Sequence, residues 1–510
     1  MVLAVTVLGT GVVYLDQSAL NVALPHIQVA LNADVGGLQW VIDVYILVLA
    51  VLLLIGGALG DRYGRVRVYI IGMVIFVAAS MFAGTANSVG MLVAARALQG
   101  VGGSLLVPGG LAIINATVAS ERRGQMLGAW GAFSPLIVLT GPLIGGWMVD
   151  HVSWRAVFYL NVPLGAIACF IAMRYVPESR DEQRHGPLDW LGVATLMTGL
   201  GGLLFGLIEG PHFGWGAPLV VGALVLGAAG MIAFVFAELR AASPLMPLRL
   251  FRNRTFTGIN LMTLIHYFAL SSVFFFLTLN LQQAQGYMAF QAGLAQMPSS
   301  LALMLLSRTA GKLTDRIGPI PLMTAGVLLN CLGLFLLSRI GIDVNYWTTF
   351  FPAILVFGVG LGLMVVPLTA VALGALPSRY SGIASGLNNA VSRVAQMSAV
   401  AVFGAVMVSG FRAGLITRTA ALPLDEAARA QLLSDARNLG ATMPPPGLSP
   451  ETTLATQMAI RLAFVDGFRQ IMLIAMVMTL AGLIVMLALV RYQPVPETAA
   501  SETIPSAVES

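Results

Sequence analysis

Fourteen apolar stretches, each long enough to cross a lipid bilayer, limit what this chain can fold into. A membrane-spanning helix needs about 20 mainly apolar residues. Charged residues make up only 10% of the sequence, whereas soluble domains carry about 25%. The sequence therefore predicts an all-α integral membrane protein with fourteen transmembrane helices. The spans are expected at residues 6–27, 40–60, 68–86, 91–117, 126–149, 155–174, 189–208, 217–237, 256–280, 291–309, 320–338, 348–374, 383–409 and 468–490.

The distribution of arginines predicts how the spans are oriented. Both termini lie on one side of the membrane because the number of spans is even. With the N-terminus inside, the inner loops and the C-terminal end carry seventeen Arg and Lys residues, while the short outer loops carry only Arg155 and Arg339. Short loops rich in positive charge stay on the cytoplasmic side. We therefore expect a multi-pass protein of the inner cell membrane with both termini cytoplasmic.

Two segments outside the spans are more polar than the rest. Residues 410–467 lie on the outer side in this topology. Apolar residues at helical spacing over 423–439, followed by prolines at 444–446, predict a helical hairpin there. The tail 493–510 is polar and acidic and is predicted to be disordered.

A short charged motif occurs twice. "GALGDRYG" at 57–64 and "GKLTDRIG" at 311–318 share the pattern G-x-L-x-D-R-x-G and lie 254 residues apart. Each copy follows the second span of a six-span block. Two related six-helix halves are a common plan of secondary transporters. We expect halves at 1–175 and 256–492, with two inserted spans at 176–255.

The repeated motif predicts a joint that governs conformation. Glycines let helix ends approach closely and turn tightly. Asp61 is expected to cap the next helix. The arginines of the same loop are expected to pair with the other half in one conformation only, and such a contact biases the equilibrium between the two conformations. The alternative is that these charged residues only fix the orientation of the chain in the membrane. The expected gate residues are Gly57, Asp61, Arg62, Gly64 and Arg65, with Gly311, Asp315, Arg316 and Gly318 in the second copy.

Further motifs make the chain resemble the major facilitator superfamily, and within it the fourteen-span drug:proton antiporters. "LDQSALNVALP" (15–25) is similar to the span-1 motif of that group, and "LVAARALQGVGG" (92–103) to the superfamily's span-4 motif. "GPLIGG" resembles the span-5 antiporter motif through Gly141, Pro142, Gly145 and Gly146. Ile137 departs from that motif, which usually has glycine there, so close packing of span 5 is in question.

The resemblance implies a fold and a function. The fold is the major facilitator fold, with two pseudo-symmetric halves and two inserted helices. The implied function is antiport, in which protons enter while an amphipathic, cationic or aromatic drug leaves the cytoplasm. The proton gradient supplies the energy without a cofactor. The expected partners are a small-molecule substrate, protons and the lipid bilayer, and we expect a monomer.

Ionisable side chains within the spans are candidates for coupling, because charge inside a bilayer is costly. Asp16 lies in the middle of span 1 and is a candidate proton carrier. The resemblance ties Arg96 of span 4 to proton coupling. A fixed structural pair is the alternative for both residues. Asp43 in span 2 is a second candidate for proton coupling or for the attraction of a cationic substrate, with a simple interfacial residue as an equal alternative.

Other polar residues within the spans are candidates for the substrate cavity. They are Asn21, Gln99, His266 and Asn388. For His266, a hydrogen bond between helices is an equal alternative. Arg393 in span 13 is expected near the cytoplasmic mouth, with snorkelling toward the membrane surface as the favoured explanation.

The sequence argues against several other classes of protein. The net charge of +5 comes from scattered arginines, which do not form the basic patch of a nucleic-acid-binding protein. No Walker motif, metal-ligand cluster or catalytic constellation is visible, so we expect neither an ATP-driven pump nor an enzyme. Two alternatives remain: an exporter dedicated to one natural product, siderophore or metabolite, and a membrane-embedded sensor or enzyme without transport.

Overall fold

The computed structural model describes residues 1–118, 126, 130, 137, 140–180, 189–241, 244–376 and 381–491. Every regular element in these ranges is a helix. Thirteen of the described helices are long and apolar enough to cross a membrane. They correspond to thirteen of the fourteen expected spans. The other, 126–149, lies partly outside the described residues, and its part from 140 onward is helical.

The first group of helices comes from the N-terminal third of the chain. Its members are α1 (Val2–Leu31), α2 (Val35–Tyr63), α3 (Arg65–Gly84), α4 (Val89–Thr117), the span-5 segment (residues 140–151), α6 (Ala156–Tyr159) and α7 (Asn161–Tyr175). We call this set the N-terminal group. The inserted pair consists of α8 (Trp190–Phe213) and α9 (Pro218–Arg240).

The second group follows a short helix, η1 (Leu248–Arg252). It contains α10 (Arg254–Leu279), η2 (Asn280–Ala284), α11 (Ala289–Ile317), α12 (Pro319–Ser338), η3 (Tyr346–Phe350), α13 (Phe351–Gly374), α14 (Ser381–Thr419), α15 (Glu426–Ser434), η5 (Asp435–Ala441) and α16 (Pro450–Leu489). We call this set the C-terminal group. Both expected inserted spans are therefore present, and in the sequence they lie between the two groups.

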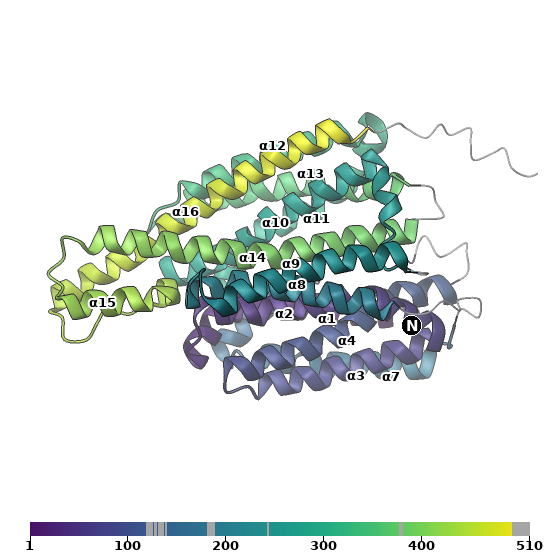
Figure 1. Cartoon of the computed structure of the whole chain (residues 1–510), viewed down its shortest axis with the longest axis horizontal. Helices are drawn as coiled ribbons and strands as arrows, with labels where there is room; N and C mark the ends of the chain where they lie inside the picture. The colour runs from purple at the N-terminus through teal and green to yellow at the C-terminus, as the bar shows by residue number, and fades with distance from the viewer. Residues whose placement is uncertain are drawn as a thin grey trace, which may run out of the picture.

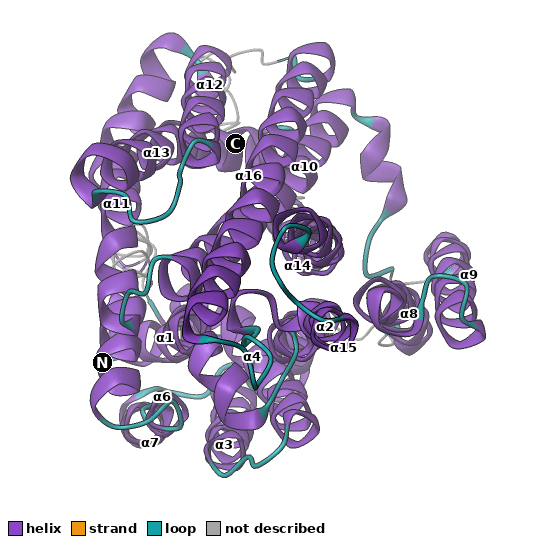
Figure 2. Ribbon diagram, turned by 90° about the vertical axis from the view of Figure 1, so that its left-hand side faces the viewer, coloured by secondary structure: helices purple, strands orange, loops and turns teal. Residues whose placement is uncertain are grey.

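The two groups lie side by side, with a long dimension that runs along the helices (Figure 1). The N-terminal group packs against the C-terminal group through α1, α2, α10, α11 and α14. The pair α8–α9 lies to one side, where α8 contacts α2 and α14 (Figure 2). The described ends of the chain lie at the same end of the bundle (Figure 1), as an even number of spans requires.

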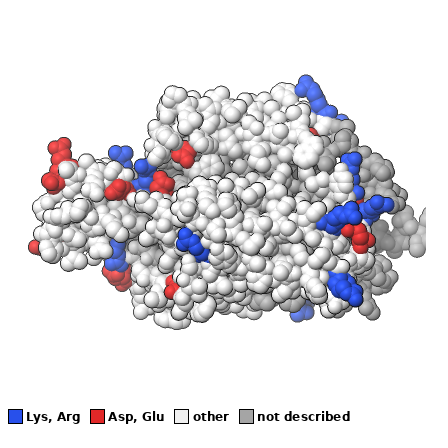
Figure 3. Space-filling model, turned by 90° about the horizontal axis from the view of Figure 1, so that it is seen from below, with Lys and Arg blue, Asp and Glu red and all other residues white. Residues whose placement is uncertain are grey.

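The predicted hairpin of residues 410–467 is present. The last part of α14 and the first part of α16 continue beyond the bundle, and α15 and η5 connect them (Figure 1). Leu432 and Leu439 are buried inside this projection. We call this side of the bundle the hairpin end and the opposite side, where Gly64 and Gly318 lie, the loop end. Charged side chains gather at these two ends, and few lie between them on the face shown in Figure 3.

The two groups repeat the same close helix contact. In the N-terminal group, α3 meets α4 at Gly102, where an added Cβ would lie 2.7 Å from the backbone nitrogen of Phe76. In the C-terminal group, α12 meets α13 at Gly326, where a Cβ would lie 2.7 Å from the carbonyl oxygen of Gly360. In lipid the hydrophobic effect does not drive helices together, and close van der Waals packing, which small residues allow, takes its place.

Gly102→Ala should destabilise the protein, because the new methyl group would overlap backbone that cannot move aside. We expect a loss of about 1–3 kcal/mol, typical of overpacking, and a lower thermal unfolding temperature in detergent. Gly222→Ala in α9 is the matched control, because no atom lies within 4 Å of the position of its Cβ. Equal unfolding temperatures for the two variants would show that the α3–α4 contact is not tight.

Candidate functional site

Asp16 and Arg96 meet in the interior of the N-terminal group. The Nη1 group of Arg96 on α4 donates a hydrogen bond to Oδ2 of Asp16 on α1. The Nε group of Arg96 donates to the carbonyl oxygen of Val41 on α2 at 3.1 Å. Both charged side chains are at most 1% exposed. Removing one partner of such a buried pair costs about 3–5 kcal/mol.

Neutral side chains complete the surroundings of the Asp16 carboxylate. Asn161 on α7 and Gln99 on α4 donate to its Oδ1 atom at 2.7 and 3.1 Å. Both amides also donate to the hydroxyl oxygen of Ser80 on α3, at 3.2 and 2.8 Å. Gln99 is thus part of this network. Sequence reasoning missed Asn161 and Ser80, although each is an isolated polar residue within an apolar span.

Tyr45 of α2 covers the guanidinium group of Arg96. The Cζ atom of Arg96 lies 4.2 Å from the centroid of the Tyr45 ring, within the range of a cation–π interaction. Tyr45 is fully buried. The arginine is therefore held by α1, α2 and its own helix α4.

Asp43 and His266 are buried without partners. Asp43 on α2 is 0% exposed, and neither carboxyl oxygen has a hydrogen-bond partner among the described residues. The same holds for both ring nitrogens of His266 on α10. An ionised group buried without a partner carries a high free-energy cost. Within the part of the chain that the structure describes, neither side chain therefore has the hydrogen bond that would explain its presence inside a span.

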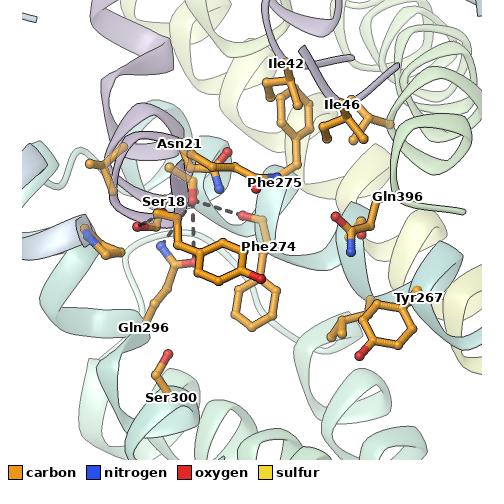
Figure 4. Close-up of a pocket in the computed structure, with 18 residues that line it drawn as sticks. Ser18, Asn21, Ile42, Ile46, Tyr267, Phe274, Phe275, Gln296, Ser300 and Gln396 are labelled. Atoms are coloured by element: carbon orange, nitrogen blue, oxygen red, sulfur yellow. Dashed lines mark hydrogen bonds between the residues drawn. The ribbon is translucent and has the colours of Figure 1, made fainter. Parts of the chain in front are cut away.

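A cavity of about 290 Å³ lies between the two groups. Its walls come from α1, α2, α10, α11, α14 and Pro142 of the span-5 segment, and Figure 4 shows Asn21, Tyr267, Gln296 and Gln396 around it. The described lining combines amides, tyrosines, hydroxyl groups and apolar residues, and it contains no acidic or basic residue. A mainly apolar pocket with a few polar groups is typical of a small-molecule site.

Of the four residues expected at the cavity, only Asn21 is in its described lining. Gln99 belongs to the Asp16 network, and His266 is buried within α10. Asn388 of α14 donates to Asn260 and Thr263 of α10, at 3.2 and 2.9 Å, so it links two helices of one group.

Comparison with known proteins identifies the family. The model of the Major Facilitator Superfamily matches residues 6–400. The chain belongs to the major facilitator superfamily. It is accordingly a membrane transporter that handles small molecules, and not an enzyme.

The relatives of this major facilitator protein include resistance proteins. It is 32% identical over 482 residues to the multidrug resistance protein Stp of Mycobacterium tuberculosis, covering 93% of this chain and 89% of Stp. It is 33% identical over 410 residues to a methylenomycin A resistance protein of Bacillus subtilis, covering 80% and 87% of the two chains. The family predicted from the motifs is thus confirmed.

Solved structures bear out the fold. The crystal structure of a bacterial homologue of the human lysosomal transporter Spinster superposes with a TM-score of 0.65 at 16% identity, covering 97% of this chain and 98% of that one. Together with the all-helical architecture, this similarity confirms the predicted major facilitator fold.

The two copies of the major facilitator loop motif have the same backbone shape. Gly64 separates α2 from α3 with a φ of 110°, and Gly318 separates α11 from α12 with a φ of 82°. L-residues with a side chain rarely adopt such angles. The final glycine of the motif is therefore required at both helix junctions.

The helix cap expected from Asp61 comes instead from Glu178. Its two carboxylate oxygens accept hydrogen bonds from the backbone nitrogens of Val66 and Arg67 at 2.9 and 3.0 Å. Asp61 cannot cap α3 because α2 continues to Tyr63, and its carboxylate binds Arg65 at 3.0 Å. In the second copy, Asp315 and Arg316 are exposed and form no ion pair with a described residue.

The span-5 motif packs against α1 of its own group on one side and against α11 of the C-terminal group on the other. A Cβ on Gly145 would lie 2.8 Å from the Cα atom of Ala19 on α1, and one on Gly146 would lie 2.6 Å from the Cα atom of Phe290 on α11. Gly141 contacts Ser18, and the Pro142 carbonyl faces Gly293. Ile137, which departs from the family pattern, packs against Gly11 of α1. A glycine on the partner helix thus makes room for the larger residue, and α1 still packs closely.

Polar contacts close the hairpin end of the interface. Gln282 donates to the carbonyl oxygen of Val22 at 3.0 Å, and Gln283 donates to Gln28 at 2.7 Å. The Asp150 carboxylate accepts from the first two backbone nitrogens of α11 at 3.1 and 2.8 Å. Among the described residues, every hydrogen bond that joins the two groups lies between the level of Gln17 and the hairpin end. The structure is therefore closed at the hairpin end.

Gly146→Ala should shift the protein away from this closed arrangement, because the new methyl group would overlap the backbone of Phe290. Spin labels at the exposed positions 29 and 288, in a background without Cys169 and Cys331, should report a longer distance by pulsed electron paramagnetic resonance. Gly90→Ala is the control, since nothing lies within 4 Å of its Cβ position. An unchanged distance in a folded Gly146→Ala protein would contradict the proposed contact.

Proposed function

We propose that this protein is a proton-coupled antiporter that exports amphipathic, aromatic or cationic compounds from the cytoplasm. The names of its relatives, which include a multidrug resistance protein, support drug export. The observation that most directly supports proton coupling is the position of Asp16. It is a buried acid, and the next two residues of α1, Gln17 and Ser18, line the cavity.

Protonation of Asp16 would change the contacts of α1. A neutral carboxyl group loses its Coulombic attraction to Arg96, which α2 still holds through Val41 and Tyr45. The position of α1 relative to α2 and α4 then depends on the proton. Because α1 carries both Asp16 and part of the cavity wall, proton binding and substrate binding favour different conformations.

Asp43 is proposed as a second proton-binding residue. It is fully buried, and no described side chain or backbone group satisfies its carboxyl oxygens. A structural acid would be expected to have such a partner. The high cost of ionising an unpartnered buried acid favours exchange of a proton over permanent charge.

The proposed orientation places both termini in the cytoplasm and the hairpin outside, in the cell membrane. The arginine-rich loops support this orientation. A protein closed at the hairpin end would then load substrate from the cytoplasm, with the proton gradient as the energy source and no cofactor. We propose that one chain contains the complete pathway, so that a monomer transports.

A dedicated exporter of one natural product is the second candidate. The methylenomycin A resistance protein, which matches 80% of this chain, is named for a single compound. Protection of an efflux-deficient host against one compound only would favour this candidate. Protection against many unrelated compounds would favour the multidrug function.

Asp16→Asn should abolish proton-driven transport, because the amide keeps the shape of the side chain and cannot ionise. In everted vesicles, the variant should accumulate dye no faster than vesicles without the protein, and it should not protect an efflux-deficient host. Asp343→Asn is the control: its carboxylate is exposed, and its φ of 52° suits asparagine. If Asp16→Asn protects as well as the wild type against every compound, Asp16 does not couple protons to transport.

Asp61→Asn should reduce the transport rate while substrate affinity stays close to that of the wild type. The change removes the charge that holds Arg65 across the junction of α2 and α3, far from the cavity lining. Asp315→Asn is the matched control at the same motif position, where no ion pair with a described residue exists, and its effect should be smaller. Weakened binding with a normal rate of conformational exchange would refute the gating role.

A further inference from the structure

Arg393 lies beside the cavity, in the middle of the membrane-spanning part of α14. It is twelve residues from the start of the helix, or roughly 18 Å at the rise of an α-helix. Its Nη1 group donates to Oε1 of Gln17 at 3.2 Å, and its Cζ atom lies 5.9 Å from the ring centroid of Tyr14. Both Gln17 and Tyr14 line the cavity. The side chain thus points across to α1 and does not snorkel to the membrane surface.

This guanidinium group has no acidic partner among the described residues. By comparison, Arg96 is fully buried and forms an ion pair with Asp16, whereas Arg393 is half-buried. A guanidinium group has five N–H donors, and Gln17 accepts from one nitrogen of Arg393. An unpaired cation at this depth is costly, which favours an external anion as its missing partner.

The described lining of the cavity carries no compensating negative charge. No acidic residue is in the described lining. Asp16 is adjacent in the chain to Gln17, but Arg96, Gln99 and Asn161 occupy its carboxylate oxygens. Asp43 follows the lining residue Ile42 in the chain, but its carboxyl group is fully buried and is not itself in the described lining. A cationic substrate would therefore approach an unpaired positive charge and find no carboxylate in the described lining.

The lining suits a flat ring system with polar substituents. Tyr14, Tyr267, Phe274 and Phe275 supply aromatic surfaces, and Gln396 lies one helical turn beyond Arg393 on α14. Aromatic rings favour offset-stacked or edge-to-face packing with a planar ligand. Amide side chains can donate to or accept from its oxygen substituents.

We infer that the cavity binds aromatic compounds that carry an anionic group, such as a carboxylate or an ionised phenol or enol, and that Arg393 binds that group. This inference rests on the proposed export function. It narrows the expected substrates, which included cationic compounds, to aromatic anions. Arg393 is thereby a specificity-determining residue: it selects the charge of the substrate, and the aromatic side chains select its flat shape.

Two dyes with the same xanthene ring system test the inference. Fluorescein is anionic at neutral pH, and rhodamine 123 is cationic. Fluorescence anisotropy with the full-length protein in detergent should show fluorescein binding about tenfold more tightly or better, the range of a hydrogen bond to a charged group. Arg393→Gln should abolish this preference, and Arg393→Lys, which keeps the charge, should retain part of it.

Arg412→Gln is the matched control for these measurements. It removes an exposed arginine from the same helix and should leave the preference for fluorescein unchanged. Rhodamine 123 binding as tightly as fluorescein to the wild type would overturn the inference. So would an Arg393→Gln protein that weakens binding of both dyes equally, since that result indicates a purely structural role. The wild-type comparison decides the matter even if Arg393→Gln does not fold.

Transport in vesicles tests the proposed function separately. Binding preference for fluorescein without proton-driven movement of any dye would contradict antiport and support the assignment of the site. Proton-driven movement of rhodamine 123 in preference to fluorescein would support antiport and overturn the assignment. The two failures are therefore distinguishable.

Discussion

The ion pair between Arg96 and Asp16 is the contact on which the N-terminal group depends. Burying two charges is costly unless their remaining hydrogen-bonding groups are satisfied. Here α2 supplies a carbonyl oxygen and the Tyr45 ring to the arginine, while Gln99 and Asn161 donate to the carboxylate. Several helices therefore meet at one charged centre. The position of α1 in particular is fixed by an interaction whose strength depends on charge.

The same helix forms one wall of the cavity. Tyr14, Gln17, Ser18 and Asn21 recur at the spacing of one helical face and line the cavity, whereas Asp16 points to Arg96 on the other side. Close packing of the span-5 segment against Ala19 limits how far α1 can move within its group. A change at Asp16 thus reaches the cavity through one helix, without an intervening chain of side chains.

Thirteen of the fourteen spans and the family could be predicted and are confirmed, because apolar length and short motifs are local properties of the sequence. The direction of a side chain within a span was harder to predict. When most faces of a helix are apolar, the periodicity of the sequence does not distinguish the lipid-facing side from the side that faces the protein interior. The sequence therefore could not show that Gln99, His266 and Asn388 lie outside the described cavity lining. Glu178 caps α3 from a position more than a hundred residues away, and Gly11 accommodates Ile137 on another helix. Such partners are set by tertiary packing alone.

The arrangement of charges bears on how protons and substrate would be coupled. A carboxylate shared by both would let a cationic substrate displace a proton directly. Here the acid of α1 is enclosed within its own group, and the charge beside the cavity is the guanidinium group of Arg393. An anion bound there would compete with Gln17, the residue next to Asp16, for the same guanidinium group. In this protein, the proton and the substrate would bind to different side chains. Proton binding would therefore affect substrate binding by changing the position of α1.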